Sequence, residues 1–222
     1  MSTVDYKMHG AVAVITMDNP PVNGLGHDLR IGLMDGLKRA SGDEAVKAVV
    51  LMGTPKAFSG GADISEFNTP KATTDPTLHQ IIDTLDGMKK PVVAGIGGFA
   101  MGGGLELALA CHFRVALPGT QLALPEVNLG ILPGAGGTQR LPRAIGVKPA
   151  LDMMVSGKPV PSEKAPAGLI DEIAQGDLAK AAVAYAEKIV AEKRPLRRLR
   201  DGKATLDDAP AYFAATREKV VK

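Results

Sequence analysis

The chain has 222 residues, 45% hydrophobic and 23% charged, so it can bury the core of one or two folded domains. Its formal net charge of +2 and its aromatic content of 4% argue against nucleic-acid binding, which favours a basic face interleaved with aromatic side chains. The single cysteine, Cys111, excludes an internal disulfide and a cysteine-based metal cluster. Its apolar neighbours predict a buried, unreactive thiol.

The N-terminal half predicts a β-hairpin followed by a strand, a helix and a strand. Residues 4–9 and 11–18 form the hairpin, which turns at Gly10, and the second run is rich in β-branched residues. The spacing of leucines predicts a helix over residues 28–39, and the apolar run 47–53 predicts a buried strand. This order of elements is typical of a crossover unit in an α/β fold.

A turn of small residues, 57–64, comes next. Its Asp63 is placed to cap free N–H groups at a helix start. Residues 68–77 are polar and contain two prolines, so they predict a mobile loop, and residues 78–88 predict a helix.

The second half begins with a buried strand over residues 92–96 and the glycine-rich turn 97–104. The further predicted elements are a helix over 105–111, short strands at 113–117 and 121–124, and a turn or one helical turn at 125–129. A second glycine-rich turn at 134–138 precedes a short helix, and further helices are predicted at 147–156, 162–167 and 178–192. The arginine-rich segment 192–203 predicts a solvated linker rather than an anion site. A helical pattern continues to residue 222, so we expect a piece of a longer protein.

Several common sites and signals are excluded. Residues 95–100 formally match the dinucleotide fingerprint, but the acid that should bind the ribose about 20 residues later is missing. The four histidines lack metal-ligand spacing, and no serine lies in a nucleophile elbow. The N-terminus is no secretory signal, and the long apolar stretch 92–110 carries Glu106, which a membrane span would rarely do. We expect a protein of the cytosol or an organelle lumen without a membrane partner.

Two carboxylates stand out in residues 91–147. Only Glu106 and Glu126 occur there, whereas the chain-wide frequency of 24 acids in 222 residues would give about six, and both lie among small and apolar residues. The glycines of 102–104 open a helix whose N–H groups could hold a developing oxyanion, and the turn 60–62 offers a second set of donors. Either glutamate alone could be a helix-end carboxylate, but together they favour acid–base catalysis.

Three blocks, AFSGGADI, GGFAMGGGLELALACHFRVA and LPEVNLGILPGAGGTQRLPRAIG, resemble the enoyl-CoA hydratase/isomerase (crotonase) superfamily over residues 4–190. NPPVNG, CHFRVA and the arginine-rich tail are most similar to the N-terminal hydratase part of bifunctional β-oxidation enzymes, in which a 3-hydroxyacyl-CoA dehydrogenase part follows. The resemblance implies an α/β, ClpP-like superhelix of repeated β-β-α units with two nearly perpendicular sheets. It implies a catalytic domain over residues 1–190 and a helical, basic linker over 191–222 towards a further part.

The resemblance also implies roles for individual residues. Ala62 of GGAD and Gly103 of GGGLE correspond to the oxyanion-hole N–H donors, and Glu106 and Glu126 to the two catalytic acids. Substrate contacts are implied for Gly61, Asp63, Gly102, Pro133 and Gly134. The implied reaction is hydration of a trans-2-enoyl-CoA thioester, which needs no metal and no cofactor beyond the coenzyme A of the substrate. Alternatives are Δ3-Δ2-enoyl-CoA isomerisation at the same site and non-catalytic acyl-CoA binding.

The sequence departs from the family pattern at one place. Many hydratases carry a lysine soon after GADI that approaches the CoA phosphates, whereas Ser65 and Glu66 follow here, so those contacts are unassigned. Single-domain members trimerise through C-terminal helices and bifunctional members are often monomers, so the resemblance allows a monomer or a trimer. It implies a cytoplasmic protein in a bacterium and a peroxisomal one in a eukaryote.

Overall fold

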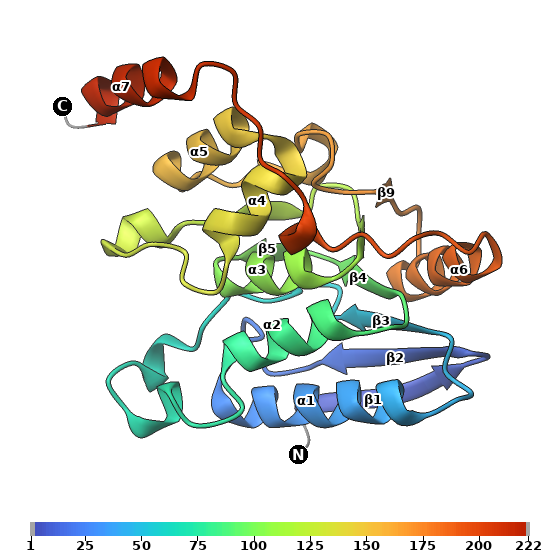
Figure 1. The fold of residues 1–222 in the computed structure, drawn as a ribbon. Coiled ribbons are helices and arrows are strands. Elements are labelled where there is room, and N and C mark those ends of the chain that lie inside the picture. The colour runs from blue at the N-terminus through green and yellow to red at the C-terminus, as the bar shows by residue number, and fades with distance from the viewer. Residues whose placement is uncertain (1–2, 221–222) are drawn as a thin grey trace.

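The computed structural model describes residues 3–220 (Figure 1). Its strands are β1 (Val4–His9), β2 (Val12–Met17), β3 (Ala48–Met52), β4 (Val92–Ile96), β5 (Phe99–Met101), β6 (Phe113–Ala116), β7 (Gln121–Ala123), β8 (Val160–Pro161) and β9 (Glu172–Ile173). Its α-helices are α1 (His27–Gly42), α2 (Leu78–Gly87), α3 (Gly103–Ala110), α4 (Gly137–Ile145), α5 (Val147–Ser156), α6 (Leu178–Ala191) and α7 (Ala209–Val220). Short 3-10 helices are η1 (Ile64–Glu66), η2 (Pro70–Ala72), η3 (Glu126–Leu129), η4 (Ser162–Lys164) and η5 (Leu199–Asp201).

The strands form two sheets. The larger sheet has the order β1-β2-β3-β4-β6-β9, in which β1 is antiparallel to β2 and the other neighbours are parallel. The smaller sheet has the order β5-β7-β8. The chain passes from β4 in the larger sheet to β5 in the smaller one before α3, and from β6 to β7 before η3 and α4. This alternation is the repeated β-β-α unit, so the predicted fold class is confirmed.

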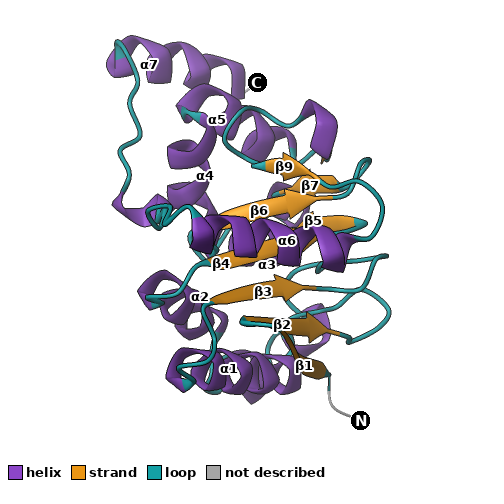
Figure 2. Cartoon of the chain, turned by 90° about the vertical axis from the view of Figure 1, so that its right-hand side faces the viewer, coloured by secondary structure: helices purple, strands orange, loops and turns teal. Residues whose placement is uncertain are grey.

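The inner strands of the larger sheet are buried on both faces. On β3, Val49 and Leu51 join the core beneath α1, α2 and α3, whereas Val50 and Met52 join the core beneath α6. Figure 2 shows α6 crossing the face of this sheet that is turned to the viewer. Because both faces need apolar cover, β3 and β4 are continuously apolar rather than alternating. None of the helices between residues 3 and 220 is both long and apolar enough to cross a membrane.

Most predicted elements are confirmed to within a few residues, but short ones differ. The helix predicted over residues 162–167 is wrong: it is the single turn η4, because Pro166 disfavours helical backbone at Ala165, which is extended (ψ 139). Three short strands, β5, β8 and β9, were not predicted, and β5 lies within the stretch expected to be only a glycine-rich turn. Residues 221 and 222 of the predicted terminal helical pattern lie outside the described residues.

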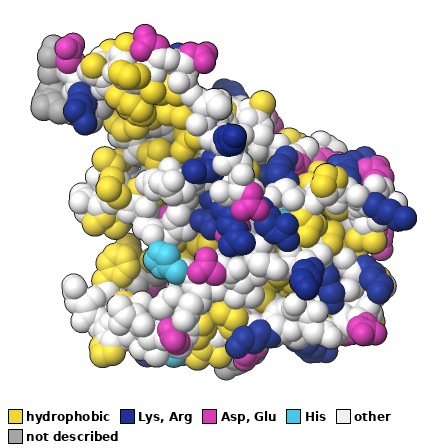
Figure 3. All heavy atoms as spheres, viewed as in Figure 1, with side chains coloured by type: hydrophobic (Ala, Val, Ile, Leu, Met, Phe, Trp, Pro, Cys, Tyr) yellow, Lys and Arg dark blue, Asp and Glu magenta, His cyan; other side chains and the backbone are white. Residues whose placement is uncertain are grey.

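The arginine-rich segment is exposed over most of its length, as the sequence predicts, but it is docked on the folded body at Arg198 and Leu199. Arg198 donates from Nε to the carbonyl of Asp86 (2.7 Å) and from Nη2 to that of Met88 (2.9 Å), at the end of α2. Leu199 is buried, and Gly202 accepts a hydrogen bond from Arg143 of α4 (3.0 Å). Figure 3 shows Lys and Arg side chains gathered in the middle of this face, where Figure 1 shows η5 between α2 and α4. Hydrogen bonds from guanidinium groups to carbonyls therefore attach this segment to α2 and α4.

We predict that Arg198→Gln destabilises the protein by about 1–3 kcal/mol, because charge-assisted hydrogen bonds to two buried carbonyls are weakened. The matched control is Arg200→Gln, whose side chain is 46% exposed and makes only longer ion pairs, and it should shift stability by less than about 0.5 kcal/mol. Urea denaturation measures both. Equal, small shifts would show that the segment is a loose linker after all.

Candidate active site

The predicted site residues meet at one pocket of about 390 Å³. It lies between the turn after β3, the N-terminus of α3 and the loop before α4. Among its lining residues are the predicted Ala62, Asp63, Gly103, Glu106, Glu126 and Gly134. Gly61, Gly102 and Pro133 do not line it, although each is adjacent in sequence to a residue that does. No group of three His, Cys, Asp or Glu side chains in residues 3–220 is arranged to hold a metal ion.

The two glycine-rich turns approach each other backbone to backbone. A Cβ atom on Gly61 would lie 2.8 Å from the Met101 carbonyl oxygen and 3.0 Å from the Gly103 nitrogen. One on Gly104 would lie 2.4 Å from the carbonyl oxygen of Ser59. These distances are too short for a side chain, so glycine is required for the contact.

This close approach brings two backbone N–H donors side by side. The Ala62 nitrogen lies 3.3 Å from where a Cβ on Gly103 would be. Neither the Ala62 N–H nor the Gly103 N–H donates a hydrogen bond to another group in the described part of the chain. Two free donors at the start of a helix favour a negatively charged oxygen between them.

A buried polar network supports the first turn. The Ser59 hydroxyl donates to the carbonyl of Asn23 (2.7 Å) and accepts from the N–H of Gly61 (3.0 Å). The Asn23 amide in turn donates to the carbonyls of Met17 (3.1 Å) and Ala57 (2.9 Å). Asn23 belongs to the NPPVNG motif, so this motif holds the turn that carries Ala62.

Glu106 is buried in the first turn of α3 and is 3% exposed. Its Oε1 accepts hydrogen bonds from the N–H groups of Ala135 (2.7 Å) and Gly137 (2.8 Å), at the N-terminus of α4. Burial raises the pKa of Glu106 above its usual range, and these two N–H groups, followed by the charges of His79 and Arg140, oppose the rise. The ionised form of this carboxylate is therefore stabilised in part despite its burial.

Glu126 lies at the start of η3 and is 8% exposed. Its Oε2 is buried and has no hydrogen-bond partner among the described residues, in contrast to Oε1 of Glu106. Burial is the main cause that raises the pKa of Glu126, and the nearby carboxylate of Glu106 raises it further. The two glutamates thus have raised pKa values for the same main reason, but they differ in hydrogen bonding.

Two further side chains hold the loop that binds Glu106. Arg140 of α4 forms a buried ion pair with Asp86 of α2, and its Nη1 donates to the carbonyl of Ala135 (3.4 Å). The Nε2–H of His79 donates to the carbonyl of Gly134 (2.8 Å), because a carbonyl only accepts. This loop is therefore tied to α2 on both sides of the N–H groups that Glu106 binds.

Sequence reasoning did not identify Ala135, Gly137, His79 or Arg140 as parts of the site. The one available signal was the glycine-rich turn at residues 134–138 before a helix, which is a place for free N–H groups. The Cys111 thiol lies outside the pocket lining and is fully buried, which raises its pKa to about 12. The prediction of a buried thiol is confirmed.

Residues 7–212 match the enoyl-CoA hydratase/isomerase family. The chain belongs to this family. Curated relatives include the peroxisomal bifunctional enzyme of Homo sapiens, 43% identical over 194 residues, which cover 87% of this chain and 27% of the relative. Another is the glyoxysomal fatty acid beta-oxidation multifunctional protein MFP-a of Brassica napus, 45% identical over 203 residues, which cover 87% of this chain and 28% of the relative. The chain thus spans about a quarter of the length of these relatives.

Solved structures agree with the family assignment. An enoyl-CoA hydratase from Bacillus anthracis superimposes with a TM-score of 0.79 at 32% identity, covering 85% of this chain and 76% of that one. DspI of Pseudomonas aeruginosa superimposes with a TM-score of 0.79 at 32% identity, covering 100% of this chain and 88% of that one. The likeness extends over nearly the whole chain, so the crotonase-type fold extends beyond the three sequence motifs.

We predict that Glu106→Gln stabilises the folded protein at about pH 8, raising Tm by about 2–4 °C. The raised pKa of Glu106 means that folding loses stability as pH rises through that pKa, whereas glutamine has no charge to bury and still accepts both N–H bonds. At about pH 4, below the raised pKa, the difference should shrink. Thermal unfolding at both pH values, with the surface variant Glu44→Gln as control, measures this. A Tm below that of the parent protein at about pH 8 would contradict the conclusion that ionised Glu106 destabilises the folded protein.

Proposed function

We propose that the chain is an enoyl-CoA hydratase that adds water to the double bond of a trans-2-enoyl-CoA in fatty-acid β-oxidation. The observation that supports it best is the meeting, in one pocket, of two free backbone N–H groups with two buried carboxylates that differ in hydrogen bonding. A thioester whose double bond is conjugated to its carbonyl needs both: donors for the oxygen and two groups for the protons of water.

The thioester oxygen binds between the N–H groups of Ala62 and Gly103. As water adds at C3, negative charge moves onto this oxygen to give an enolate, and the two donors stabilise it. They are held by backbone packing and need no rearrangement during the reaction. Loss of one such donor typically lowers kcat on the order of a hundredfold.

Glu106 acts as the base and Glu126 as the acid. Glu106, which accepts two N–H bonds, takes a proton from water as its oxygen bonds to C3. The double bond between C2 and C3 becomes a single bond, and C2 takes the proton of Glu126, whose Oε2 has no hydrogen-bond partner among the described residues. The product gains one water molecule, and the proton on Glu106 returns to Glu126 to reset the pair.

Neither a metal nor a redox cofactor takes part in this proposal, because the carbonyl is polarised by hydrogen bonds and no electrons leave the substrate. The relatives are named for peroxisomes and glyoxysomes. We propose an organelle lumen or the cytoplasm as the site of action, and a monomer or a trimer as the assembly. A covalently attached 3-hydroxyacyl-CoA dehydrogenase part, as in bifunctional enzymes, would use the product directly.

We predict that Glu106→Gln and Glu126→Gln each lower kcat for crotonyl-CoA hydration by about a hundredfold or more while the circular dichroism spectrum stays unchanged. Glu44→Gln, at an exposed carboxylate outside the pocket, is the matched control and should retain full activity. Turnover near that of the parent protein in either pocket variant would overturn the assignment. An isomerase would instead keep activity on a 3-enoyl-CoA in one of the two variants, and a binding domain would bind the CoA ester without turnover.

The unequal glutamates also predict a bell-shaped dependence of kcat/KM on pH. The rate should fall at low pH as Glu106 gains a proton and at high pH as Glu126 loses its proton, with both limbs shifted upward from ordinary carboxyl values because both pKa values are raised. The limbs belong to the coupled pair rather than to single residues. Assays from about pH 5 to about pH 9 measure them, and the residual activity of Glu126→Gln should lose the high-pH limb. Persistence of that limb would assign it to another group.

A further inference from the structure

One wall of the pocket is formed by a segment without buried side chains. Residues 66–77, called the pocket wall below, contribute Glu66, Phe67, Ala72, Thr73 and Thr77 to the pocket lining, and Arg30 of α1 lines the pocket beside them. The 3-10 turns η1 and η2 in this region contain no buried residue. The sequence predicts a mobile loop over most of it. Apolar burial therefore does not explain how the wall keeps its position.

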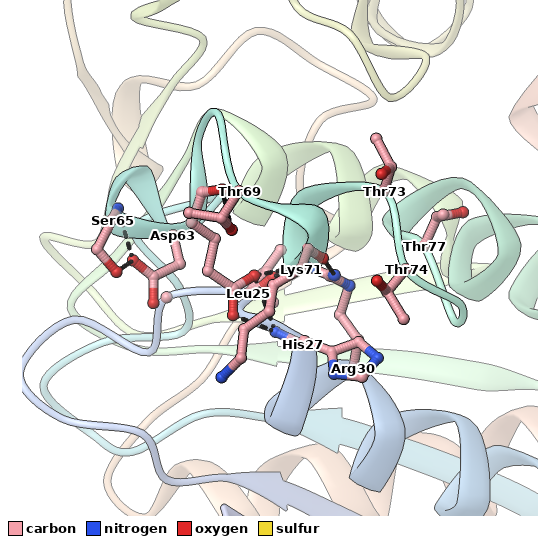
Figure 4. Close-up of polar contacts among 12 residues, drawn as sticks. Leu25, His27, Arg30, Asp63, Ser65, Thr69, Lys71, Thr73, Thr74 and Thr77 are labelled. Atoms are coloured by element: carbon pink, nitrogen blue, oxygen red, sulfur yellow. Dashed lines mark hydrogen bonds and ion pairs between the residues drawn. The ribbon is translucent and has the colours of Figure 1, made fainter.

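A single arginine ties the pocket wall to α1. Arg30, which is 5% exposed, donates from Nε to the carbonyl of Pro76 (2.8 Å) and from Nη2 to the carbonyl of Lys71 (2.6 Å). Its Nη1 donates to the carbonyl of Leu25 (2.8 Å) and to Oε2 of Glu66 (3.3 Å). Figure 4 shows Arg30 reaching from α1 towards the segment that carries Lys71. Two wall carbonyls, far apart along the loop, are thus bound by one planar guanidinium.

Glu66 completes the connection from the other end of the wall. Its carboxylate accepts from the N–H of His27 at the start of α1 (2.9 and 3.1 Å) and pairs with Arg30, and both side chains are nearly buried. An acid at a helix N-terminus is favoured by the free N–H groups there. Because α1 packs on the larger sheet through Leu29 and Leu33, the wall is fixed to the core of the protein.

We propose that Arg30, together with Glu66, is a positioning residue that determines how well the pocket accepts long acyl chains. The inference rests on the proposed hydratase function for its substrate class. A crotonyl group ends one carbon beyond C3, so it touches little more than the residues around the reacting atoms. A longer chain extends further along the pocket, whose lining includes Phe67, Ala72 and Thr73 of the wall, so its binding free energy depends more on these residues being already in position.

The variant Arg30→Lys keeps a positive charge near Glu66 but replaces a fork of donors with a single ammonium that cannot bind all the carbonyls at once. We expect KM for 2-decenoyl-CoA to rise about tenfold or more, with kcat little changed, because the wall must be ordered by each binding event. Because crotonyl-CoA contacts the wall less, kcat/KM for this substrate should fall by less than about threefold.

A matched control separates positioning from stability. Arg114 is also a buried arginine that donates to two carbonyls, those of Leu169 (2.8 Å) and Cys111 (2.9 Å), and lies near one carboxylate, Asp171 (3.7 Å), but it does not line the pocket. Arg114→Lys should lower Tm as Arg30→Lys does, yet leave the ratio of kcat/KM for the two substrates unchanged. An equal loss on both substrates in Arg30→Lys, or no loss on either, would overturn the proposal.

A second readout does not require turnover. Arg30 binds the carbonyl of Lys71, which belongs to the peptide bond that trypsin cleaves after this lysine. The variants Arg30→Lys and Glu66→Gln should therefore be cleaved between Lys71 and Ala72 about tenfold faster than the parent protein. Saturated decanoyl-CoA should slow this cleavage. Unchanged cleavage in both variants contradicts the positioning role even if hydration is confirmed. Faster cleavage without hydration of any enoyl-CoA by the parent protein would instead support the wall contact and reject the proposed function.

Discussion

The approach of two glycine turns, backbone against backbone, is the constraint on which the rest of the pocket depends. Gly61 and Gly104 leave no room for a side chain between the turn after β3 and the start of α3. This contact sets Ala62 and Gly103 as neighbours, and Glu106 then enters the pocket from the first turn of the same helix. The network of Ser59 and Asn23 keeps the first turn in place, so the site is built on main-chain geometry more than on side-chain packing.

Environment, rather than residue type, distinguishes the two carboxylates. Glu106 meets N–H groups at the start of α4, whereas Oε2 of Glu126 meets none among the described residues, so one fold gives two glutamates with different hydrogen bonding. The ion pair between Arg140 and Asp86 anchors the loop that makes this difference. A buried carboxylate charge lowers the free energy of unfolding. Such a loss of stability is typical of active sites.

Much of the fold was predictable because α1, α2, α5 and α6 have helical periodicity and β3 and β4 are continuous apolar runs. The two-residue strands β8 and β9 are too short to carry a pattern. The glutamates and glycine turns were visible as composition, but the partners of Glu106 were not, because Ala135 and Gly137 reach it only through tertiary packing. The docking of the arginine-rich segment was not predicted, because a run of charges does not reveal which carbonyls its guanidinium groups will bind.

The strand order has a consequence for how the protein reaches this state. β1 and β2 pair across a tight turn, but β3 pairs in parallel with β4, joining Val49 to Val92, and β6 pairs in parallel with β9, joining Val115 to Glu172. Closing such long loops slows folding, because chain entropy is lost before the contacts form. The turns that carry Ala62 and Gly103 follow β3 and β5, and the pairing of β3 with β4 across α2 brings these parts of the chain together. During refolding, ligand binding should therefore return with the slowest step, after most of the helical signal has recovered.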